Sequence, residues 1–174
     1  MNITENFPGE FAFGSGHINP LKAINPVLEY EASKKDYTKL LCMLFDETKV
    51  RLISGDNSTC SVGSDTGSPK DHNYPSMVAI VAPMTPFTVR SHRRAKNVDH
   101  ANSTYPAKIW SNSQVDIKVM PEVHAFKSLN EKKTFEVTII GRGIPDGSHV
   151  SASLLWSDGT HSVRSPILVQ STAA

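Results

Sequence analysis

The stretch "VSASLLWSDGTHSVRSPILV", residues 150–169, carries two apolar runs on either side of an Asp158-Gly159 turn signal. In the first run, apolar side chains occupy positions 150, 152, 154 and 156, and serines stand at 151 and 153. A period of two is typical of a strand that buries one face. The second run covers residues 163–169. The stretch therefore predicts two strands separated by a turn.

The same period recurs through the chain from about residue 74. Further alternating sets are Tyr74/Ser76/Val78/Ile80, Tyr105/Ala107/Ile109, Val115/Ile117/Val119 and Phe135/Val137/Ile139. Turn residues separate these runs, among them Gly141-Arg142-Gly143 and Pro145-Asp146-Gly147. Six or seven short strands in roughly a hundred residues predict an antiparallel β-sandwich of the immunoglobulin or fibronectin type.

The residues before position 61 carry helical signals instead. Asn19-Pro20 is typical of a helix start, because the asparagine accepts from free backbone amides and proline needs no donor there. From Asp36, which we expect to cap a second helix, leucines and Tyr37 recur at helical spacing. The sequence allows a third helical turn over residues 48–53. A segment this small, with little predicted strand, buries only a poor core by itself. We therefore expect it to be the tail end of a larger unit.

The bulk properties exclude several classes of function. The chain has 174 residues and a formal charge of +1, which predicts no general attraction to nucleic acid or anionic lipid. No apolar run is long enough to cross a bilayer. The N-terminal residues "MNITE" show no basic region followed by an apolar one, so no secretion signal is expected. Sequons at Asn2, Asn57 and Asn102 nevertheless predict N-glycosylation and a secretory-pathway ancestry.

A set of stretches in consistent order resembles the C-terminal part of the plant subtilisin-like serine proteases, the cucumisin-like subtilases. They include "EFAFGSGHINPLKAINP", "DYTKLLCML", "RLISGDNSTC", "DHNYPSM", "FKSLNEKKTFEVT" and "SASLLWSDGTHSVRSPI". The resemblance implies a small helical remnant of a subtilisin-like α/β peptidase domain over residues 1–65. A linker over residues 66–72 and a fibronectin type III-like sandwich over residues 73–174 follow. The fold class is thus mainly β.

The resemblance also implies what the chain does. Intact relatives are secreted serine endopeptidases of the apoplast or cell wall, with a Ser/His/Asp triad. Their nucleophile lies in a Gly-Thr-Ser-Met-Ala-type motif upstream of the point equivalent to Met1, with the catalytic Asp and His further upstream. We therefore expect no catalytic residue, no cofactor and no activity of this chain alone. The sandwich would stabilise or gate an upstream peptidase domain. The alternative is an independent extracellular binding module for a protein or glycan.

Residues that look like a site are interpreted as scaffold. Ser15 stands in "GSGH", which lacks the G-x-S-x-G pattern of a nucleophile elbow. The basic run "RSHRRAK", residues 90–96, is expected to be a solvated strand face. No two histidines lie three to five residues apart, so we expect no metal site and surface or half-buried imidazoles. The seven are His17, His72, His92, His100, His124, His149 and His161.

The remaining expectations concern two cysteines and three positions that depart from the family pattern. Cys42 and Cys60 match cysteines of the family, and either remain two thiols or form one disulfide if the chain is secreted. Val27 replaces a family glycine and would be strained if that position needs positive φ. Ala95 would fill less core than the usual valine. Asp99 replaces a turn glycine.

Overall fold

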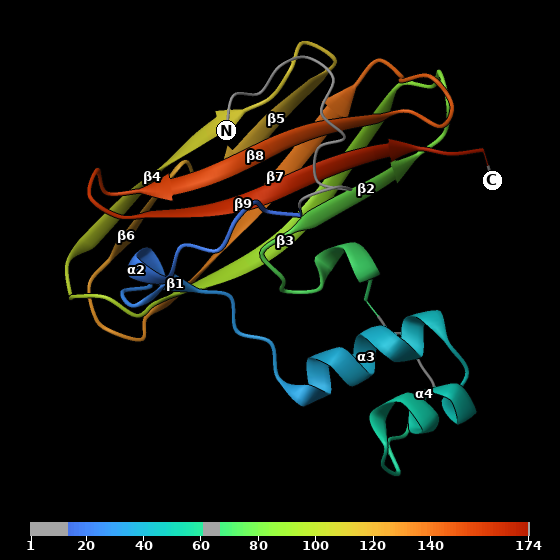
Figure 1. The fold of residues 1–174 in the computed structure, drawn as a ribbon, viewed down its shortest axis with the longest axis horizontal. Helices are drawn as coiled ribbons and strands as arrows, with labels where there is room; N and C mark the ends of the chain where they lie inside the picture. Colours follow the sequence, from blue (N-terminus) through green and yellow to red (C-terminus); the bar gives the residue numbers. More distant parts are fainter. Residues whose placement is uncertain (1–13, 61–66, 174) are drawn as a thin grey trace.

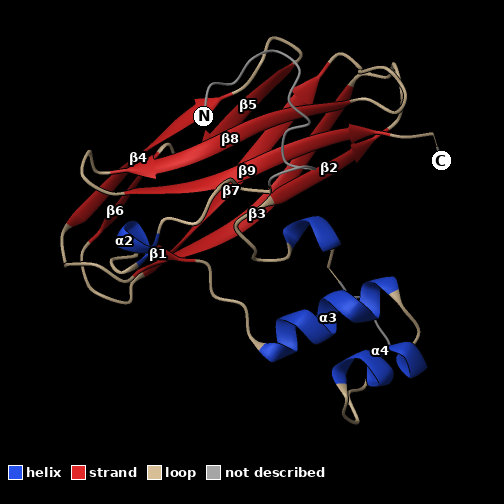
Figure 2. Cartoon of the chain, viewed as in Figure 1, coloured by secondary structure: helices blue, strands red, loops and turns tan. Residues whose placement is uncertain are grey.

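The computed structural model describes residues 14–60 and 67–173. Two β-sheets pack face to face, α3 and α4 lie together beside the sandwich, and α2 lies apart from them (Figures 1 and 2). The helical elements are α2 (Pro20–Ala23), α3 (Lys34–Leu44), α4 (Glu47–Ser54) and the 3-10 turn η1 (Pro69–Asp71). The strands are β1 (Leu28–Glu29), β2 (Met77–Val81), β3 (Phe87–Asn97), β4 (Ser103–Trp110), β5 (Val115–Met120), β6 (Val123–Phe126), β7 (Lys132–Gly141), β8 (His149–Ser157) and β9 (Ser162–Ser171).

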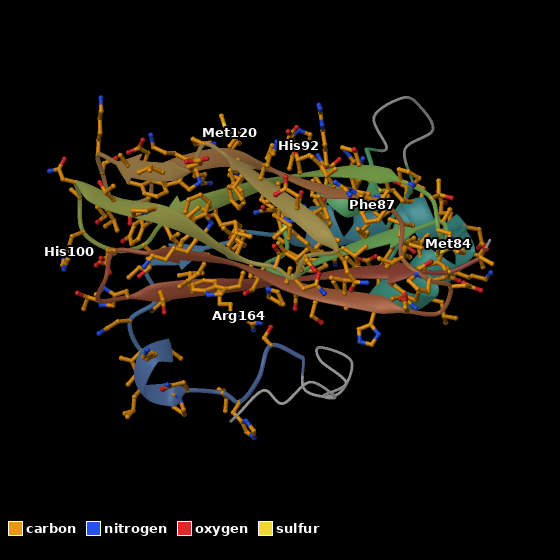
Figure 3. All side chains as sticks on the ribbon, turned by 90° about the horizontal axis from the view of Figure 1, so that it is seen from above. Met84, Phe87, His92, His100, Met120 and Arg164 are labelled. Atoms are coloured by element: carbon orange, nitrogen blue, oxygen red, sulfur yellow. A yellow bond between two sulfur atoms is a disulfide. The ribbon has the colours of Figure 1, made fainter. Side chains whose placement is uncertain are left out.

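The strand order confirms the predicted sandwich. One sheet has the order β1-β3-β7-β5 and the other the order β2-β9-β8-β4-β6. All pairs are antiparallel except β2 and β9, which run parallel. A parallel pair needs a long connection, and here most of the sandwich lies between its two strands in sequence. Figure 3 shows the two sheets edge-on, with side chains filling the space between them.

The core is built from the alternating sets that the sequence indicated. Val115/Ile117/Val119, Phe135/Val137/Ile139 and Val150/Ala152/Leu154/Trp156 are all buried, and they belong to β5, β7 and β8. Each large apolar side chain buried this way contributes about 1.5–3 kcal/mol relative to its exposed state. These strands were predictable because polar residues mark their other face.

Strand β2 buries the face opposite to the expected one. Met77, Ala79 and Val81 point into the core, whereas Val78 is 51% exposed and Ile80 is 68% exposed. All five residues of "MVAIV" are apolar, so the sequence pattern does not choose a face. A shift of one residue exchanges the two faces of a strand, and the pairing of Met77 with Ile167 of β9 sets the choice.

The helices begin where side-chain caps are available. Asn19 Oδ1 accepts from the Lys22 amide at 3.2 Å, which confirms the expected start of α2. The second helix begins earlier than expected, because Ser33 is the N-cap and Asp36 is the third residue of a capping box. Asp36 accepts the Ser33 amide at 2.7 Å, the reciprocal bond of that motif.

Two substitutions of family glycines cause no backbone strain. Val27 and Asp99 are not among the described residues with positive φ, so the strain expected for Val27 is absent. Val27 is instead 2% exposed and packs in the sandwich core with Leu28 of β1. Ala95 is fully buried on β3. Among residues 14–60 and 67–173, no helix has the length and apolar character to cross a membrane.

Candidate functional site

The helices and the sandwich meet around Arg93 of β3. Arg93 is only 5% exposed, and burial lowers the pKa of its guanidinium. Its Nε donates to the Tyr74 carbonyl at 2.9 Å, and its Nη1 donates to the carbonyls of Lys70 at 2.6 Å and His92 at 2.8 Å. Arg93 thus fixes η1 and the residues that follow it onto the sandwich through neutral acceptors.

The basic run, residues 90–96, is therefore solvated on only one face of its strand. Arg90, His92 and Arg94 are exposed, but Ser91, Arg93 and Ala95 of the same strand are buried. The interpretation of the run as a solvated face is wrong for Arg93. A buried arginine is tolerated here because backbone carbonyls accept hydrogen bonds from its N–H groups.

Side chains of η1 and of the residues that follow it bind the outer edge of β3. Asp71 Oδ1 accepts the His92 amide at 2.8 Å. Asn73 Oδ1 accepts the Arg94 amide at 2.8 Å, and Asn73 Nδ2 donates to the Arg94 carbonyl at 3.0 Å and to the Glu31 carbonyl at 2.8 Å. These contacts replace the missing neighbour strand with two polar side chains.

Ion pairs reinforce the same junction at its surface. Glu31 contacts Lys96 at 3.0 Å and Lys132 at 2.6 Å, and Lys96 also contacts Glu29 at 2.8 Å. Hydrogen bonds from Lys132 and Lys96 lower the pKa of Glu31. The exposed fractions of these side chains are 17% for Lys96, 29% for Glu31 and 47% for Lys132, so solvent still weakens the ion pairs.

Two cavities flank Arg93. The smaller, of about 300 Å³, lies between α3 and β3 and includes Glu31, Asp36, Lys39 and Arg94 in its wall. The larger, of about 700 Å³, lies along the sandwich edge between β2 and β3. Its wall consists of Tyr37, Leu40, Ser68, Pro69, Lys70, His72, Tyr74, Ser76, Val78, Ala79, Ile80, Thr88, Val89 and Arg93. We call this larger cavity the seam.

The seam combines aromatic and apolar walls with positive charge. Lys70 and Arg93 are the charged side chains in its described wall, with no carboxylate among them. The His72 ring packs edge-on against Tyr37, with 4.9 Å between centroids. His72 Nε2 is buried and has no hydrogen-bonding partner among the described residues, and burial lowers the pKa of this imidazole. The seam therefore suits a partly apolar, partly anionic partner.

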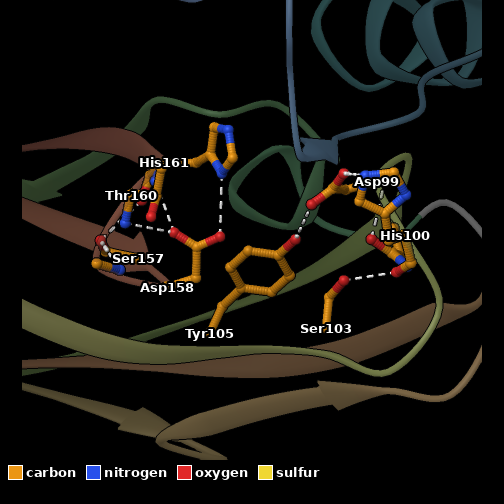
Figure 4. Close-up of polar contacts among 10 residues, drawn as sticks. Asp99, His100, Ser103, Tyr105, Ser157, Asp158, Thr160 and His161 are labelled. Atoms are coloured by element: carbon orange, nitrogen blue, oxygen red, sulfur yellow. Dashed lines mark hydrogen bonds and ion pairs between the residues drawn. The ribbon is translucent and has the colours of Figure 1, made fainter.

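A second polar cluster joins the β3–β4 turn to the β8–β9 turn (Figure 4). One ligand atom each of Asp99, Asp158 and His161 lies within 4.8 Å of the others. Asp158 accepts the amides of Thr160 at 2.8 Å and His161 at 2.6 Å, so it holds the β8–β9 turn. Histidine spacing missed this group, because the fold brings Asp99 to it from a distant turn.

The buried aromatic Tyr105 connects to that cluster. Its phenol donates to Asp99 Oδ2 at 3.3 Å, as Figure 4 shows. Burial raises the pKa of Tyr105, and the neighbouring Asp99 and Asp158 carboxylates raise it further. The phenol therefore stays protonated as a donor.

The remaining sequence-derived site residues fall in varied places. Asn57 and Asn102 are exposed, and Asn2 lies outside the described residues. Ser15 is exposed in the turn before α2, and its carbonyl accepts from Arg164 Nη1 at 3.2 Å. Figure 3 shows Arg164 on the face of the sandwich beside which this turn lies.

His124 departs most from the expectation of surface or half-buried imidazoles. It is 0% exposed on β6, and neither ring nitrogen has a partner among the described residues. Its ring lies 4.3 Å from that of Trp156 and 5.4 Å from that of Phe135, centroid to centroid. Burial lowers the pKa of His124 to about 4, so the imidazole is neutral in the folded protein near pH 7.

Cys42 of α3 and Cys60 are joined by a disulfide, with 5.5 Å between their Cα atoms. The bond ties α3 to the segment that follows α4. Because α3 has no buried residue and α4 has only Val50, little apolar packing holds the two helices together. The disulfide therefore replaces a core that this segment lacks.

We expect reduction of the disulfide to open the α3–α4 unit and leave the sandwich folded. Helices of 11 and 8 residues are marginal without tertiary support. Hydrogen exchange should show faster exchange throughout α4 after reduction, with a change below about 0.5 kcal/mol in sandwich stability. The double variant Cys42→Ser/Cys60→Ser should behave like the reduced chain. Unchanged α4 protection would contradict this account.

Comparisons of the sequence with a family model and with curated proteins agree with this architecture. A model described as "Fibronectin type-III domain" matches residues 71–169. "Subtilisin-like protease SBT4.3" of Arabidopsis thaliana is 47% identical over 173 residues, which are 98% of this chain and 23% of the relative. "Subtilisin-like protease SBT4.4" of the same plant is 47% identical over 92% of this chain and 22% of its own length. Among solved structures, a Bacteroides ovatus GH5 xyloglucanase matches 57% of this chain and 18% of its own at 10% identity, with a TM-score of 0.38.

Proposed function

Because this chain belongs to the fibronectin type-III family and matches a C-terminal part of plant subtilisin-like proteases, we propose that it serves such a protease as a non-catalytic part. It spans about a quarter of the length of the curated relatives that it matches. In the proposal, residues 1–65 complete a peptidase domain, residues 66–72 link the parts, and residues 73–174 buttress it. The protease is a secreted serine endopeptidase, and this chain alone hydrolyses no peptide.

The observation that carries the proposal is the apolar surface of the helical segment. Among the described residues before the linker, large apolar side chains remain exposed that a self-sufficient domain would bury. They are Ile18 (86% exposed), Leu21 (83%), Ile24 (72%), Leu44 (55%), Phe45 (42%), Leu52 (82%) and Ile53 (55%). Exposed apolar side chains on this scale mark a surface that another part of the protein covers.

The junction around Arg93 supports a buttressing role for the sandwich. Arg93, Asp71 and Asn73 fix η1 and the residues after it to β3, and Asn73 also holds Glu31 beside it. The helical segment therefore meets the sandwich through directed hydrogen bonds. An attached peptidase domain would inherit that fixed orientation.

A chimera tests the proposal. We expect the Arabidopsis SBT4.3 protease, with its matching part replaced by this chain, to be secreted and to hydrolyse a peptide substrate. Changing Leu21 to Asp in the chimera should abolish secretion or activity, since this side chain would face the peptidase core. The matched control Leu129→Asp, at a residue 56% exposed in the sandwich, should leave both intact.

Two results would contradict the proposal. One is a chimera in which Leu21→Asp is as active as the control variant. The other is labelling of the isolated chain by a fluorophosphonate probe, which reacts with an activated serine nucleophile.

A further inference from the structure

The outer edge of β3 is covered along only part of its length. The amides of His92 and Arg94 point away from β7, because they donate to Asp71 and Asn73. Backbone groups of an antiparallel strand alternate in direction, so those of Thr88 and Arg90 point the same way. Nearer the C-terminal end of β3, Lys96 and Asn97 pair with β1.

Coverage therefore ends at the N-terminal part of β3. Within residues 14–60 and 67–173, the outward amides and carbonyls of Thr88 and Arg90 pair with no neighbouring strand. Such an open edge binds extended peptides in other proteins by strand addition. The side-chain contacts of Asp71 and Asn73 already imitate part of such a strand.

Strand β2 provides the opposite wall of this edge. It is the end strand of its sheet, paired with β9 alone among the described strands. Thr88 and Val89 share the seam with Val78 and Ile80 of β2. Tyr74 is 50% exposed and lines the same space. An extended chain along Thr88 would place its side chains against these apolar groups.

We propose that the seam binds an extended peptide segment with apolar side chains and one carboxylate. The segment pairs with the open edge of β3 at Thr88 and Arg90. Its apolar side chains contact Tyr74, Val78 and Ile80, and its carboxylate lies near Lys70 and Arg93. This inference does not depend on the proposed protease role.

The charge of the seam determines the chemistry of the peptide. Arg93 is buried with neutral hydrogen-bond acceptors, and the Asp71 carboxylate attracts it without forming an ion pair. A buried cation gains more from a carboxylate than a solvated one, because water screens it less. Lys70 adds a second positive charge at the exposed rim. A basic peptide would meet two like charges instead.

Fluorescence anisotropy on the full chain tests the proposal. The probe is a labelled, end-blocked hexapeptide of alternating valine and threonine with one central glutamate. We expect it to bind about tenfold more tightly than the same peptide with lysine in place of glutamate. N-methylation of one central amide should weaken binding by about tenfold, because it removes a strand hydrogen bond.

Variants of the chain locate the binding site. Lys70→Glu should weaken the glutamate peptide by about tenfold and strengthen the lysine peptide. Lys108→Glu, an equally exposed change on β4, should alter neither. Thr88→Pro should weaken both peptides, because proline removes the outward amide and is tolerated at an open edge. A thermal melt checks that Thr88→Pro is folded. The N-methylated peptide tests the same strand hydrogen bonding without any change to the chain.

Three results would overturn the proposal. Equal affinity for the two charged peptides would remove the anionic specificity. Unchanged binding to Lys70→Glu, or by the N-methylated peptide, would place the peptide elsewhere. A dimer in sedimentation that Lys70→Glu dissociates, without binding of any peptide, would assign the seam to a second copy of the chain.

Discussion

Replacing Arg93 with alanine is expected to lower the free energy of unfolding by about 3–5 kcal/mol. The guanidinium donates to three backbone carbonyls, those of Lys70, Tyr74 and His92. A bond to a charged donor contributes about 1.5–3 kcal/mol, and the three are not additive, since water from the seam reaches part of the vacated space. Chemical denaturation of the purified chain, followed by tryptophan fluorescence, measures the loss.

Two companion variants separate the causes of the Arg93 effect. Arg93→Met keeps most of the buried aliphatic stem but supplies no donor, so it should recover only the packing part of the loss. Arg94→Ala changes the exposed neighbour on the same strand and should cost less than about 0.5 kcal/mol. A loss below about 1 kcal/mol for Arg93→Ala would mean that the junction does not depend on this side chain.

Acidification from pH 7 to pH 4 is expected to destabilise the sandwich by about 3 kcal/mol through His124 alone. The folded pKa of His124 is lowered from 6.5 to about 4 by burial, with a smaller effect of the Lys133 charge. Between these two pH values, His124 is therefore protonated in the unfolded chain and neutral in the folded chain. Stability is complete above about pH 6.5 and falls as the pH decreases toward the folded value.

The variant His124→Leu isolates this contribution. Leucine has a similar volume and no charge at any pH, so the variant should lack the extra loss between pH 7 and pH 4. The comparison removes the carboxylates from the difference, because they titrate in both proteins. The measurement is the unfolding free energy at several pH values. Parallel pH profiles for the two proteins would show that His124 is not buried in its neutral form.

The sandwich was largely predictable because polar residues mark the outer face of most of its strands. In β7, Glu136 and Thr138 separate Phe135, Val137 and Ile139, so the period of two is plain. In β3 the inward positions include Ser91 and Arg93, which are polar, and the small Ala95, so the strand shows no clear apolar alternation. That strand was visible from the family resemblance but not from periodicity.

The candidate site was less predictable than the fold. The burial of Arg93 depends on carbonyls of residues 70 and 74, which reach it only after the segment folds back on β3. Likewise, Asp99 and Asp158 lie far apart in sequence and meet through two turns. His124 gave no signal, because β6 is a strand of four residues in which one of the two inward positions holds this polar residue. Local sequence patterns do not reveal such contacts between residues that lie far apart in the chain.

The parallel pairing of β2 with β9 also determines when the sheet can be completed during translation. Strand β2 leaves the ribosome long before β9, and β9 is the neighbour with which it pairs. Until the final strand is synthesised, the apolar residues of β2 remain available to chaperones or to other nascent chains. The sheet that contains β2 can therefore be completed only after β9 has been synthesised.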